Sequence, residues 1–553
     1  MPQGEGESKM DIKKTADGIW AEYGKGKKFN HGIDLYDNVK KCENFYIGRQ
    51  WEGLNAPDLP KPVLNVIKRV VSYFISMIVA DDIGILVEPY TKTSQEIMKP
   101  DGTPMMVVKE EMDAIAIETE VDKVIELCNI KSQSREIVRA AAVDGDAYMY
   151  FYFDGSINTG NGAKGGIRSE ILDNTSVIFG NPYKTDLQSQ PYIIVATPRM
   201  LSDVREEAKR NGVKDIAQIM PDSDSDRYTF RDIGTSDELC TVITKFWKEK
   251  GSIHAVQTTK DVVIRKEWDT GYERYPIASF VWEKIKNCYH GQSAVLPAIP
   301  NQICINQLYA MSVHWAKTSA LPKVLYDATK ISSWSNKVGQ AIGVIGNPND
   351  ALASATGGQG STAQLQNIIE GLMQRTAEYM GANDSALGNV KPDNMGAIIA
   401  TQQASEMPLQ IQKFGFYDFM EQVVRCITDI IRTDYGTRPT SITVDGERFD
   451  GMFDFATLTD TAYSMKVDIG SSSYWSELTQ IQTADNLLAK GIIPDAVSYL
   501  ESIPDKYIKG KAKILKKLKE NQAAQAEAQM MQEQAQMMQG GAGAMPTMGQ
   551  EVM

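Results

Sequence analysis

Few residues in this 553-residue sequence stand in a spacing that could do chemistry. No two of its four histidines lie within five residues of each other, so no H-E-x-x-H metal pair is formed (His31, His254, His290 and His314). Carboxylate pairs occur at Asp81/Asp82 and Asp144/Asp146, but such pairs are common in turns and at helix ends. No nearby nucleophile, histidine or cation motif accompanies them in the sequence. Walker A loops and G-x-S-x-G elbows are absent. We therefore expect no enzyme, cofactor or metal, although a triad assembled only in space stays open.

Lysines gather near the C-terminal end of the sequence. The segment 506–519 contains seven of them (Lys506, Lys509, Lys511, Lys513, Lys516, Lys517 and Lys519). The simplest interpretation is a solvated basic helix face. The alternative is a contact with DNA or an acidic partner through Lys509, Lys513, Lys516 and Lys517. By contrast, Lys323, Lys330 and Lys337 are spaced too widely to form a patch.

The chain as a whole is acidic, with 58 Lys and Arg against 71 Asp and Glu and a net charge of −13. Proteins that grip DNA phosphates usually carry clustered excess cations, so tight general DNA binding is disfavoured. An acidic surface fits DNA that slides past without sticking, although solubility alone also explains the balance.

Cysteine usage and hydropathy indicate the compartment. The six cysteines are scattered without a C-x-x-C pair, which predicts reduced thiols rather than disulfides or structural zinc. The polar start, residues 1–14, does not resemble a signal peptide. The most apolar stretch, residues 63–80, carries Lys68 and Arg69 and is too short and too charged to span a bilayer. We expect a soluble, intracellular protein that contacts no membrane.

The first half of the chain predicts an α+β body. Residues 1–30 are rich in Gly, Lys and Glu and predict a flexible arm. Helical spacing of apolar residues follows in five segments (33–46, 63–79, 108–127, 132–144 and 201–211). Short β-like runs surround them (83–89, 147–153, 176–179, 192–197, 241–248, 262–268 and 277–282), and 155–166 is a Gly-rich, hairpin-like loop. Regular βαβ alternation is absent, which indicates an α+β arrangement.

Two uninterrupted helices dominate the second half. Pro297 and Pro300 suit a helix start, and residues 301–320 then carry no Gly or Pro. A second helix covers 362–380, and the segment between them holds β-like runs at 324–326 and 341–345. This insertion either projects from the body, with its apolar flanks buried by neighbouring copies in a ring, or folds back on its own domain. The pattern alone leaves both open.

The remaining segments alternate between loops and helices. A polar loop, residues 381–394, precedes a predicted helix at 395–407, which is broken at Pro408 and continues to 435. Strands are expected at 441–445 and 463–468, and helices at 476–490, 495–502 and 506–539. The end of the chain is low in complexity and predicts a frayed helix and a disordered tail.

Several stretches, in this order along one chain, resemble the portal proteins of tailed bacteriophages over residues 40–520. They are Phe45-Tyr46-Ile47-Gly48-Arg49-Gln50-Trp51 with Leu64-Asn65-Val66-Ile67-Lys68-Arg69, Gly291-Gln292-Ser293 with Asn301-Gln302-Ile303-Cys304-Ile305-Asn306-Gln307, the loop 381–394 with Gly396-Ala397, and Leu487-Leu488-Ala489-Lys490-Gly491-Ile492-Ile493 with Tyr499-Leu500-Glu501. None of these is a catalytic signature.

The resemblance implies a ring-forming α+β subunit, dodecameric in its assembly, with α/β wing, two-helix stem, small β-containing clip and helical crown. Its parts are the arm (1–30), wing (31–293), stem helices (294–320 and 362–380), clip (321–361), tunnel loop (381–394), wing return (395–473), crown (474–522) and tail (523–553).

The resemblance also implies where partners bind. The tunnel loop would touch sliding double-stranded DNA without sequence preference, through Asn383, Asp384, Ser385, Asn389 and Lys391. The clip, with Lys323, Asp327, Lys330 and Lys337, would meet the large terminase and later the head-completion adaptor. Major capsid and scaffolding proteins are further expected partners. The expected location is the portal vertex of the virion, after assembly in the host cytoplasm.

Three other functions compete with this interpretation. A neck or tail ring component is one, although such chains are usually shorter and lack the helix–strand–helix insertion. A metal-dependent DNA-processing enzyme is the second, but it would need convergent carboxylates with Mg²⁺ or Mn²⁺. A membrane pore is the third, and the lack of a spanning helix or a regular alternating pattern argues against it.

Overall fold

The computed structural model divides the chain into two compact units, Met1–Asp468 and Ile469–Met553. The residues that it describes are 15–53, 55, 59–79, 83–90, 94–98, 104–158, 163–222, 226, 238–320, 323–331, 343–347, 349, 352–355, 362–382, 406–444, 447–458, 463–469, 474–490, 492, 496–503, 508, 511, 514–515 and 517–518. Within them, helices and mainly antiparallel sheets occur together, so the predicted α+β class is confirmed.

A helix occupies most of the segment expected to be a flexible arm. This helix, α2 (Ala16–Gly32), is capped by Thr15, whose Oγ1 accepts a hydrogen bond from the Gly18 amide at 3.2 Å. Its buried Ile19 and Tyr23, one turn apart, join a small apolar cluster with strand residues. Gly26 permits the close approach, since a Cβ there would lie 2.2 Å from Cγ2 of Ile178. The expectation of a loose arm is therefore wrong from residue 16 onward, because interior glycines masked a helix that packs on a sheet.

The main sheet has five antiparallel strands in the order β10-β9-β8-β7-β6. Its strands are β6 (Val177–Phe179), β7 (Tyr192–Met200), β8 (Leu239–Glu249), β9 (Ser252–Thr258) and β10 (Val263–Asp269). A three-stranded sheet has the order β11-β4-β5, with β4 (Asp146–Asn158), β5 (Lys164–Asp173) and β11 (Ile277–Val281). Of these strands, β5 and β9 lie outside the predicted runs. The others overlap them.

Three further two-stranded pairs complete this part of the chain, apart from the hairpin between the two long helices of the second half. They are β1 (Ile83–Pro89) with β16 (Tyr463–Ile469), β2 (Ser94–Met98) with β3 (Pro104–Val108), and β14 (Thr437–Val444) with β15 (Glu447–Asp454). The strand predicted at 83–89 is confirmed to the residue, whereas β2, β3 and β15 were not predicted.

The largest core lies where helices pack on the three-stranded sheet. Its helices are α3 (Leu35–Ile47), α4 (Val66–Ile78), α5 (Lys109–Leu127), α6 (Ile130–Asp144) and α11 (Gln410–Ile430), while α7 (Leu201–Arg210) packs on the five-stranded sheet. Helix α11 lies against β11, where Phe280 meets Phe416 and Phe419. The predicted break at Pro408 is confirmed, because a 3-10 turn (Met407–Leu409) precedes α11. A π-helical turn (Ile431–Tyr435) follows α11.

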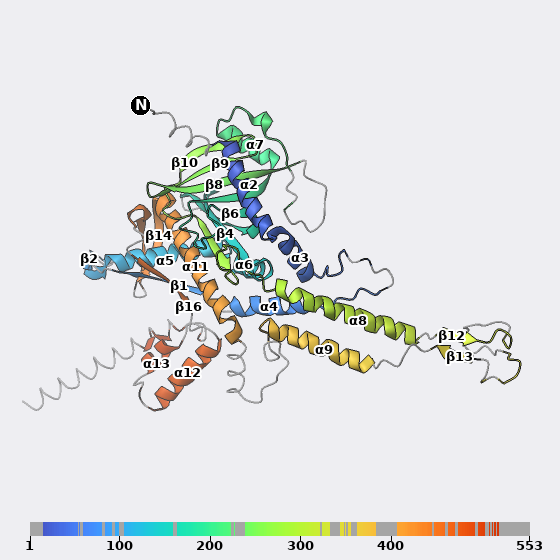
Figure 1. Cartoon of the computed structure of the whole chain (residues 1–553). Coiled ribbons are helices and arrows are strands. Elements are labelled where there is room, and N and C mark those ends of the chain that lie inside the picture. The colour runs from blue at the N-terminus through green and yellow to red at the C-terminus, as the bar shows by residue number, and fades with distance from the viewer. Residues whose placement is uncertain are drawn as a thin grey trace, which may run out of the picture. The chain divides into compact units, whose positions relative to one another are not determined.

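The two long helices of the second half pack against each other (Figure 1). They are α8 (Ile299–Ala320) and α9 (Thr362–Tyr379), and α8 is about 33 Å long. The start of α8 and the end of α9 contribute to the main core, for example through Ile305 and Ala377. The outer half of α8 is largely exposed, so the pair extends beyond the core instead of folding back on it. We call α8 and α9 the helix pair.

A short antiparallel hairpin separates the two helices in the sequence. Its strands are β12 (Lys323–Tyr326) and β13 (Leu352–Ala355), with Lys323 opposite Ala355. The first predicted run, 324–326, is confirmed. The second, 341–345, is not a strand at residues 343–345, and the partner strand lies later in the chain.

The second unit contains α12 (Tyr474–Ala489) and α13 (Ala496–Ser502), which pack together and confirm the helices predicted there. The Tyr499 hydroxyl on α13 donates to Asp485 on α12. The predicted helix at 395–407 falls almost wholly outside the described residues, as does most of the one at 506–539. Among the helices in the described ranges, none combines the length and the apolar character needed to cross a membrane.

Candidate functional site

The start of α8 carries two amide side chains that are almost completely buried, Gln302 and Asn306. They lie one helical turn apart, and Gln302 Nε2 donates to Asn306 Oδ1 at 3.1 Å. Gln302 Nε2 also donates to the Leu64 carbonyl at 2.7 Å, and its Oε1 accepts from the Val66 amide at 3.0 Å. One glutamine thus satisfies the backbone of a segment 238 residues away in the sequence.

Asn306 extends the same set of contacts toward the end of α3. Its Oδ1 accepts from the Leu64 amide at 3.1 Å, and its Nδ2 donates to Gln50 Oε1 at 2.5 Å. Gln50 in turn donates to the Phe45 carbonyl at 2.8 Å. Asn65 donates to the Phe45 carbonyl at 3.2 Å and caps α4 by accepting from the Lys68 amide at 3.0 Å. We call Gln50, Asn65, Gln302 and Asn306 the amide network.

The amide network joins three of the sequence stretches on which the family resemblance depends. Gln50 comes from the first stretch, Asn65 from the second, and Gln302 with Asn306 from the fourth. None of the four side chains carries a charge, and their contacts fix where the helix pair leaves the core. The sequence signal for part of this network was the i, i+4 spacing of two amides, Gln302 and Asn306, on one helix.

The remaining N-terminal stretch, Gly291-Gln292-Ser293, lies against the turn that ends α6. A Cβ on Gly291 would lie 2.3 Å from the Gly145 carbonyl oxygen, and Gly145 itself has a φ of +107°. Both positions therefore require glycine. Ser293 follows, with its hydroxyl donating to the Val143 carbonyl at 2.5 Å and accepting from the Val295 amide at 2.9 Å.

The carboxylate pair at this turn does not form an open acid–base site. Asp146 is buried and its Oδ2 lies 2.9 Å from Nδ1 of buried His290, while its Oδ1 accepts from Asn174 at 3.2 Å. Sequence reasoning missed the contact with His290 because the two residues are 144 positions apart. Burial raises the pKa of Asp144 well above its ordinary value, and no hydrogen bond reaches its Oδ1. This cluster is enclosed and structural, and Asp81/Asp82 lie outside the described residues.

A cavity of about 460 Å³ lies beside the amide network. Its wall includes Lys40, Lys41 and Arg49 together with the acidic Asp37 and Glu52. The mixture of charges gives no single-sign surface for a phosphate or for a metal. The cavity lies at the junction where the helix pair leaves the core.

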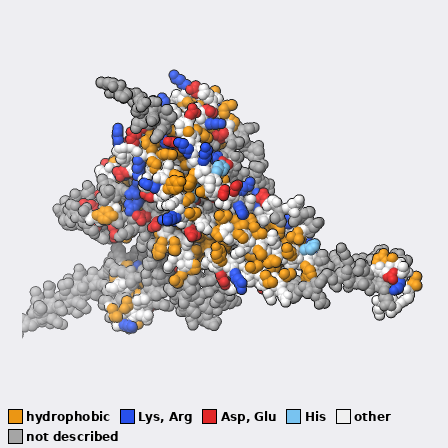
Figure 2. All heavy atoms as spheres, in the orientation of Figure 1, with side chains coloured by type: hydrophobic (Ala, Val, Ile, Leu, Met, Phe, Trp, Pro, Cys, Tyr) orange, Lys and Arg blue, Asp and Glu red, His pale blue; other side chains and the backbone are white. Residues whose placement is uncertain are grey.

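Large apolar side chains are exposed along the helix pair and the nearby start of α11. Figure 2 shows hydrophobic side chains gathered over this part of the molecule. We call six of them the apolar band: Met311 on α8, Ile368 and Tyr379 on α9, Met407 just before α11, and Ile411 and Phe414 on α11. The last three follow i, i+4, i+7 spacing and so form one stripe. Exposed apolar side chains that gather on one part of a molecule in this way indicate an interaction surface.

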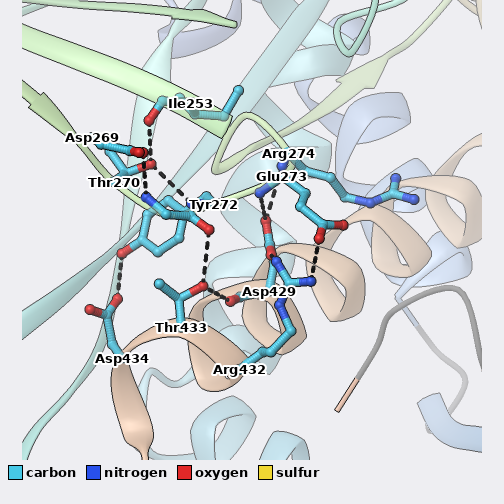
Figure 3. A network of polar contacts seen from close by, with 11 residues as sticks. Ile253, Asp269, Thr270, Tyr272, Glu273, Arg274, Asp429, Arg432, Thr433 and Asp434 are labelled. Atoms are coloured by element: carbon cyan, nitrogen blue, oxygen red, sulfur yellow. Dashed lines mark hydrogen bonds and ion pairs between the residues drawn. The ribbon is translucent and has the colours of Figure 1, made fainter. Parts of the chain in front are cut away.

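A second polar network fastens the end of α11 to the loop between β10 and β11 (Figure 3). Asp429 Oδ2 accepts from the backbone amides of Glu273 at 2.8 Å and Arg274 at 3.0 Å. Its Oδ1 accepts from Arg432 Nη2 at 2.7 Å, and Arg432 Nη1 reaches Glu273 Oε1 at 2.5 Å. We call Glu273, Asp429 and Arg432, together with the pair described next, the ionic network.

The ionic network continues through a tyrosine. The Tyr272 hydroxyl donates to Asp434 Oδ2 at 2.7 Å, and the two residues are 162 positions apart. Burial raises the pKa of Asp429 and of Asp434, although the amides and Arg432 act in the opposite direction on Asp429. Burial and the contact with Asp434 also raise the pKa of Tyr272. These contacts hold the loop between β10 and β11 against the end of α11.

Only some of the predicted partner-binding residues fall within the described ranges. In the clip, Asp327 and Lys330 form an exposed turn, with Nζ 3.4 Å from Oδ2, and the Thr329 hydroxyl and amide lower the pKa of Asp327. Lys323 begins β12, and Lys337 lies outside the described residues. Lys517 is exposed. The other predicted residues lie outside the described residues: Asn383, Asp384, Ser385, Asn389, Lys391, Lys509, Lys513 and Lys516.

Comparisons with known proteins give little further guidance. No family model matches the chain. No curated protein matches it. Among solved structures it is similar to a chain from the "Virion of native gene transfer agent (GTA) particle", at 9% sequence identity and a TM-score of 0.41, over 85% of this chain and 94% of that one.

Proposed function

We propose that the chain is a portal-type subunit of a phage-like particle. Copies assemble into a dodecameric ring at one vertex of the capsid, and DNA passes through the ring during packaging and ejection. The ring docks the large terminase and afterwards a neck adaptor, within a shell of capsid and scaffolding proteins. The role is mechanical, so ATP hydrolysis belongs to a separate motor and the subunit itself catalyses nothing.

The observation that carries the proposal is the helix pair with its apolar band. An isolated subunit would leave this band in water, whereas side-by-side packing of copies buries such surfaces and closes a ring. The stretches that resemble portal proteins build the amide network at the base of the same helices. The resemblance and the exposed band therefore concern one region of the chain.

Electron microscopy and native mass of the purified full chain test the ring. We expect rings with a central hole and a mass near twelve times 61.3 kDa. Replacing Ile411 and Phe414 with Asp should leave folded monomers, because these side chains are 79% and 58% exposed before assembly. Met220→Asp is the matched control, since Met220 is 61% exposed but lies outside the band.

One result would contradict the ring, and another would contradict the role of the apolar band in it. One is a wild-type chain that stays monomeric at high concentration even with its scaffolding protein. The other is equal assembly of the Ile411→Asp/Phe414→Asp and wild-type chains, which would remove the apolar band from the interface. Circular dichroism of each variant establishes that the subunit is folded.

The tunnel loop provides a separate test of DNA passage. Asn383→Ala/Asp384→Ala/Asn389→Ala should reduce packaging or retention of DNA while rings still form. Normal packaging and retention by this variant would exclude the loop from the mechanism. The clip is tested in the same way by Lys330→Ala, with terminase and adaptor binding to preformed rings as the readout.

A further inference from the structure

Three neighbouring strands of the five-stranded sheet bring together a histidine and two glutamates. Glu249 ends β8, His254 lies in β9 and Glu267 lies in β10. One ligand atom from each residue lies within 4.8 Å of the others. The three come from separate strands in the order β10-β9-β8, so the sheet itself creates the cluster.

The register of the sheet places His254 and Glu249 on one face. His254 is paired with Trp247 on β8 and with Asp269 on β10. Directly paired residues of an antiparallel sheet share a face, and so do residues two positions apart along a strand. Glu249 lies two positions from Trp247 and so shares this face. Glu267 lies in an irregular part of β10, between Arg265 and Trp268, where its Oε1 is 3.2 Å from His254 Nδ1.

Local contacts hold two of the three ligands in position. The His254 ring stacks on the Trp247 indole, with centroids 5.8 Å apart and 29° between the planes. The Trp247 Nε1 donates to Glu249 Oε2 at 3.3 Å. The tryptophan therefore orients both the imidazole and one carboxylate, which is the role of a supporting group around a metal.

The geometry at His254 Nδ1 points to a ligand. This atom is buried and lies 3.2 Å from Glu267 Oε1, but the geometry gives no hydrogen bond between them. The separation suits two donors on one tetrahedral ion, because ligand bonds of about 2.1 Å place neighbouring ligands about 3.4 Å apart. The His254 and Glu267 side chains keep 19% and 28% of their surface exposed, so an ion could enter from solvent.

We propose that Glu249, His254 and Glu267 bind one divalent transition-metal ion of the Zn²⁺ class. One imidazole nitrogen and two carboxylate oxygens suit Zn²⁺, with water in the fourth position, whereas Ca²⁺ and Mg²⁺ favour sites made wholly of oxygen. The bound ion ties the neighbouring strands β8, β9 and β10 together. This inference does not depend on the proposed portal function.

Another histidine in the chain provides a matched control. His31 Nε2 lies 3.2 Å from Asp226 Oδ2, the same separation as in the proposed site. Lys27 also contacts that carboxylate, and a cation competes with a metal ion there. The pair His31/Asp226 should therefore bind no metal, although its histidine and carboxylate are equally close.

Calorimetric titration of the full chain with ZnCl₂, backed by metal analysis after dialysis, tests the site. We expect one Zn²⁺ per chain, with binding weakened by about tenfold or more in His254→Ala and in the isosteric Glu267→Gln, because each removes a direct ligand. His31→Ala should bind as the wild type does. Co²⁺ should quench Trp247 fluorescence, and this component should be missing in Trp247→Phe.

Three outcomes would overturn the proposal. They are a wild type that binds no Zn²⁺, equal binding by Glu267→Gln and the wild type, and loss of binding in His31→Ala alone. Glu267→Gln preserves the shape of the side chain, so it keeps the test informative if His254→Ala fails to fold. If the variants are less stable but neither they nor the wild type bind metal, the cluster acts only as an ion pair.

Discussion

The amide network at the start of α8 and the ionic network at the end of α11 both join segments far apart in the sequence, but they use opposite chemistry. The first is built from uncharged amides, of which Gln302 and Asn306 are buried almost completely. The second contains a buried aspartate, a partly exposed arginine and a glutamate that is 53% exposed. The comparison shows two ways to satisfy a buried backbone, one insensitive to pH and salt and one dependent on both.

The difference follows from burial. Uncharged amides lose less hydration free energy on burial than ions do, so a fully enclosed junction favours them. A carboxylate near the surface keeps part of its hydration and can pair with a cation at lower cost. The helix pair is therefore fixed by directional hydrogen bonds, while the loop before β11 is fixed by charge.

The largest expected effect is in the ionic network. Asp429→Ala removes the acceptor of two backbone amides and one partner of Arg432, and should lower the free energy of unfolding by about 3–5 kcal/mol. Urea denaturation of the full chain measures it. Asp418→Ala, on the same helix but outside the network, is the control. A loss equal to that of the control would show that the network contributes little.

A somewhat smaller effect is expected in the amide network. Gln302→Ala leaves the Leu64 carbonyl and the Val66 amide without their partner and should cost about 2–3 kcal/mol. Gln307→Ala, on the same helix but outside the network, should have a much smaller effect. If both substitutions lower the free energy of unfolding by the same small amount, water takes the place of the glutamine side chain. The junction would then be open to solvent.

The pH dependence separates the two networks. Burial raises the folded-state pKa of Asp429 above its unfolded value of about 3.9, so folding takes up a proton between the two pKa values. Wild-type stability relative to Asp429→Asn should therefore increase as the pH falls from neutral toward about 4. The corresponding difference for Gln302→Ala should not change. Parallel pH profiles for Asp429→Asn and the wild type would contradict the raised pKa of Asp429.

The smallest effect is expected at the exposed end of the ionic network. Glu273→Ala removes only the half-exposed partner of Arg432 and should cost less than about 1 kcal/mol. Added salt should reduce this difference further, because exposed ion pairs are screened. Urea denaturation at low and high ionic strength measures the effect. If Glu273→Ala lowers the free energy of unfolding as much as Asp429→Ala does, the Glu273–Arg432 pair supplies most of the stabilisation.

Local periodicity determined most of the elements in advance. Apolar spacing and the positions of Pro gave both members of the helix pair and the break at Pro408, and β-branched and aromatic runs gave β1, β4 and β8. One of the missed elements has a local cause and another a long-range cause. Glycines inside α2 concealed a helix in which Gly26 allows close packing against Ile178. Strands such as β9 gain their partners only from the sheet.

The sequence by itself determined the α+β class, the long helices and the residues of the resemblance. Only the tertiary structure decided which of those residues meet. It brings Gln50, Leu64 and Asn306 into one network, pairs Asp146 with His290, and sets Glu249, His254 and Glu267 on neighbouring strands. Spacing along a chain fixes contacts within a helix or strand, whereas contacts across hundreds of residues depend on how the elements pack, which no local pattern encodes.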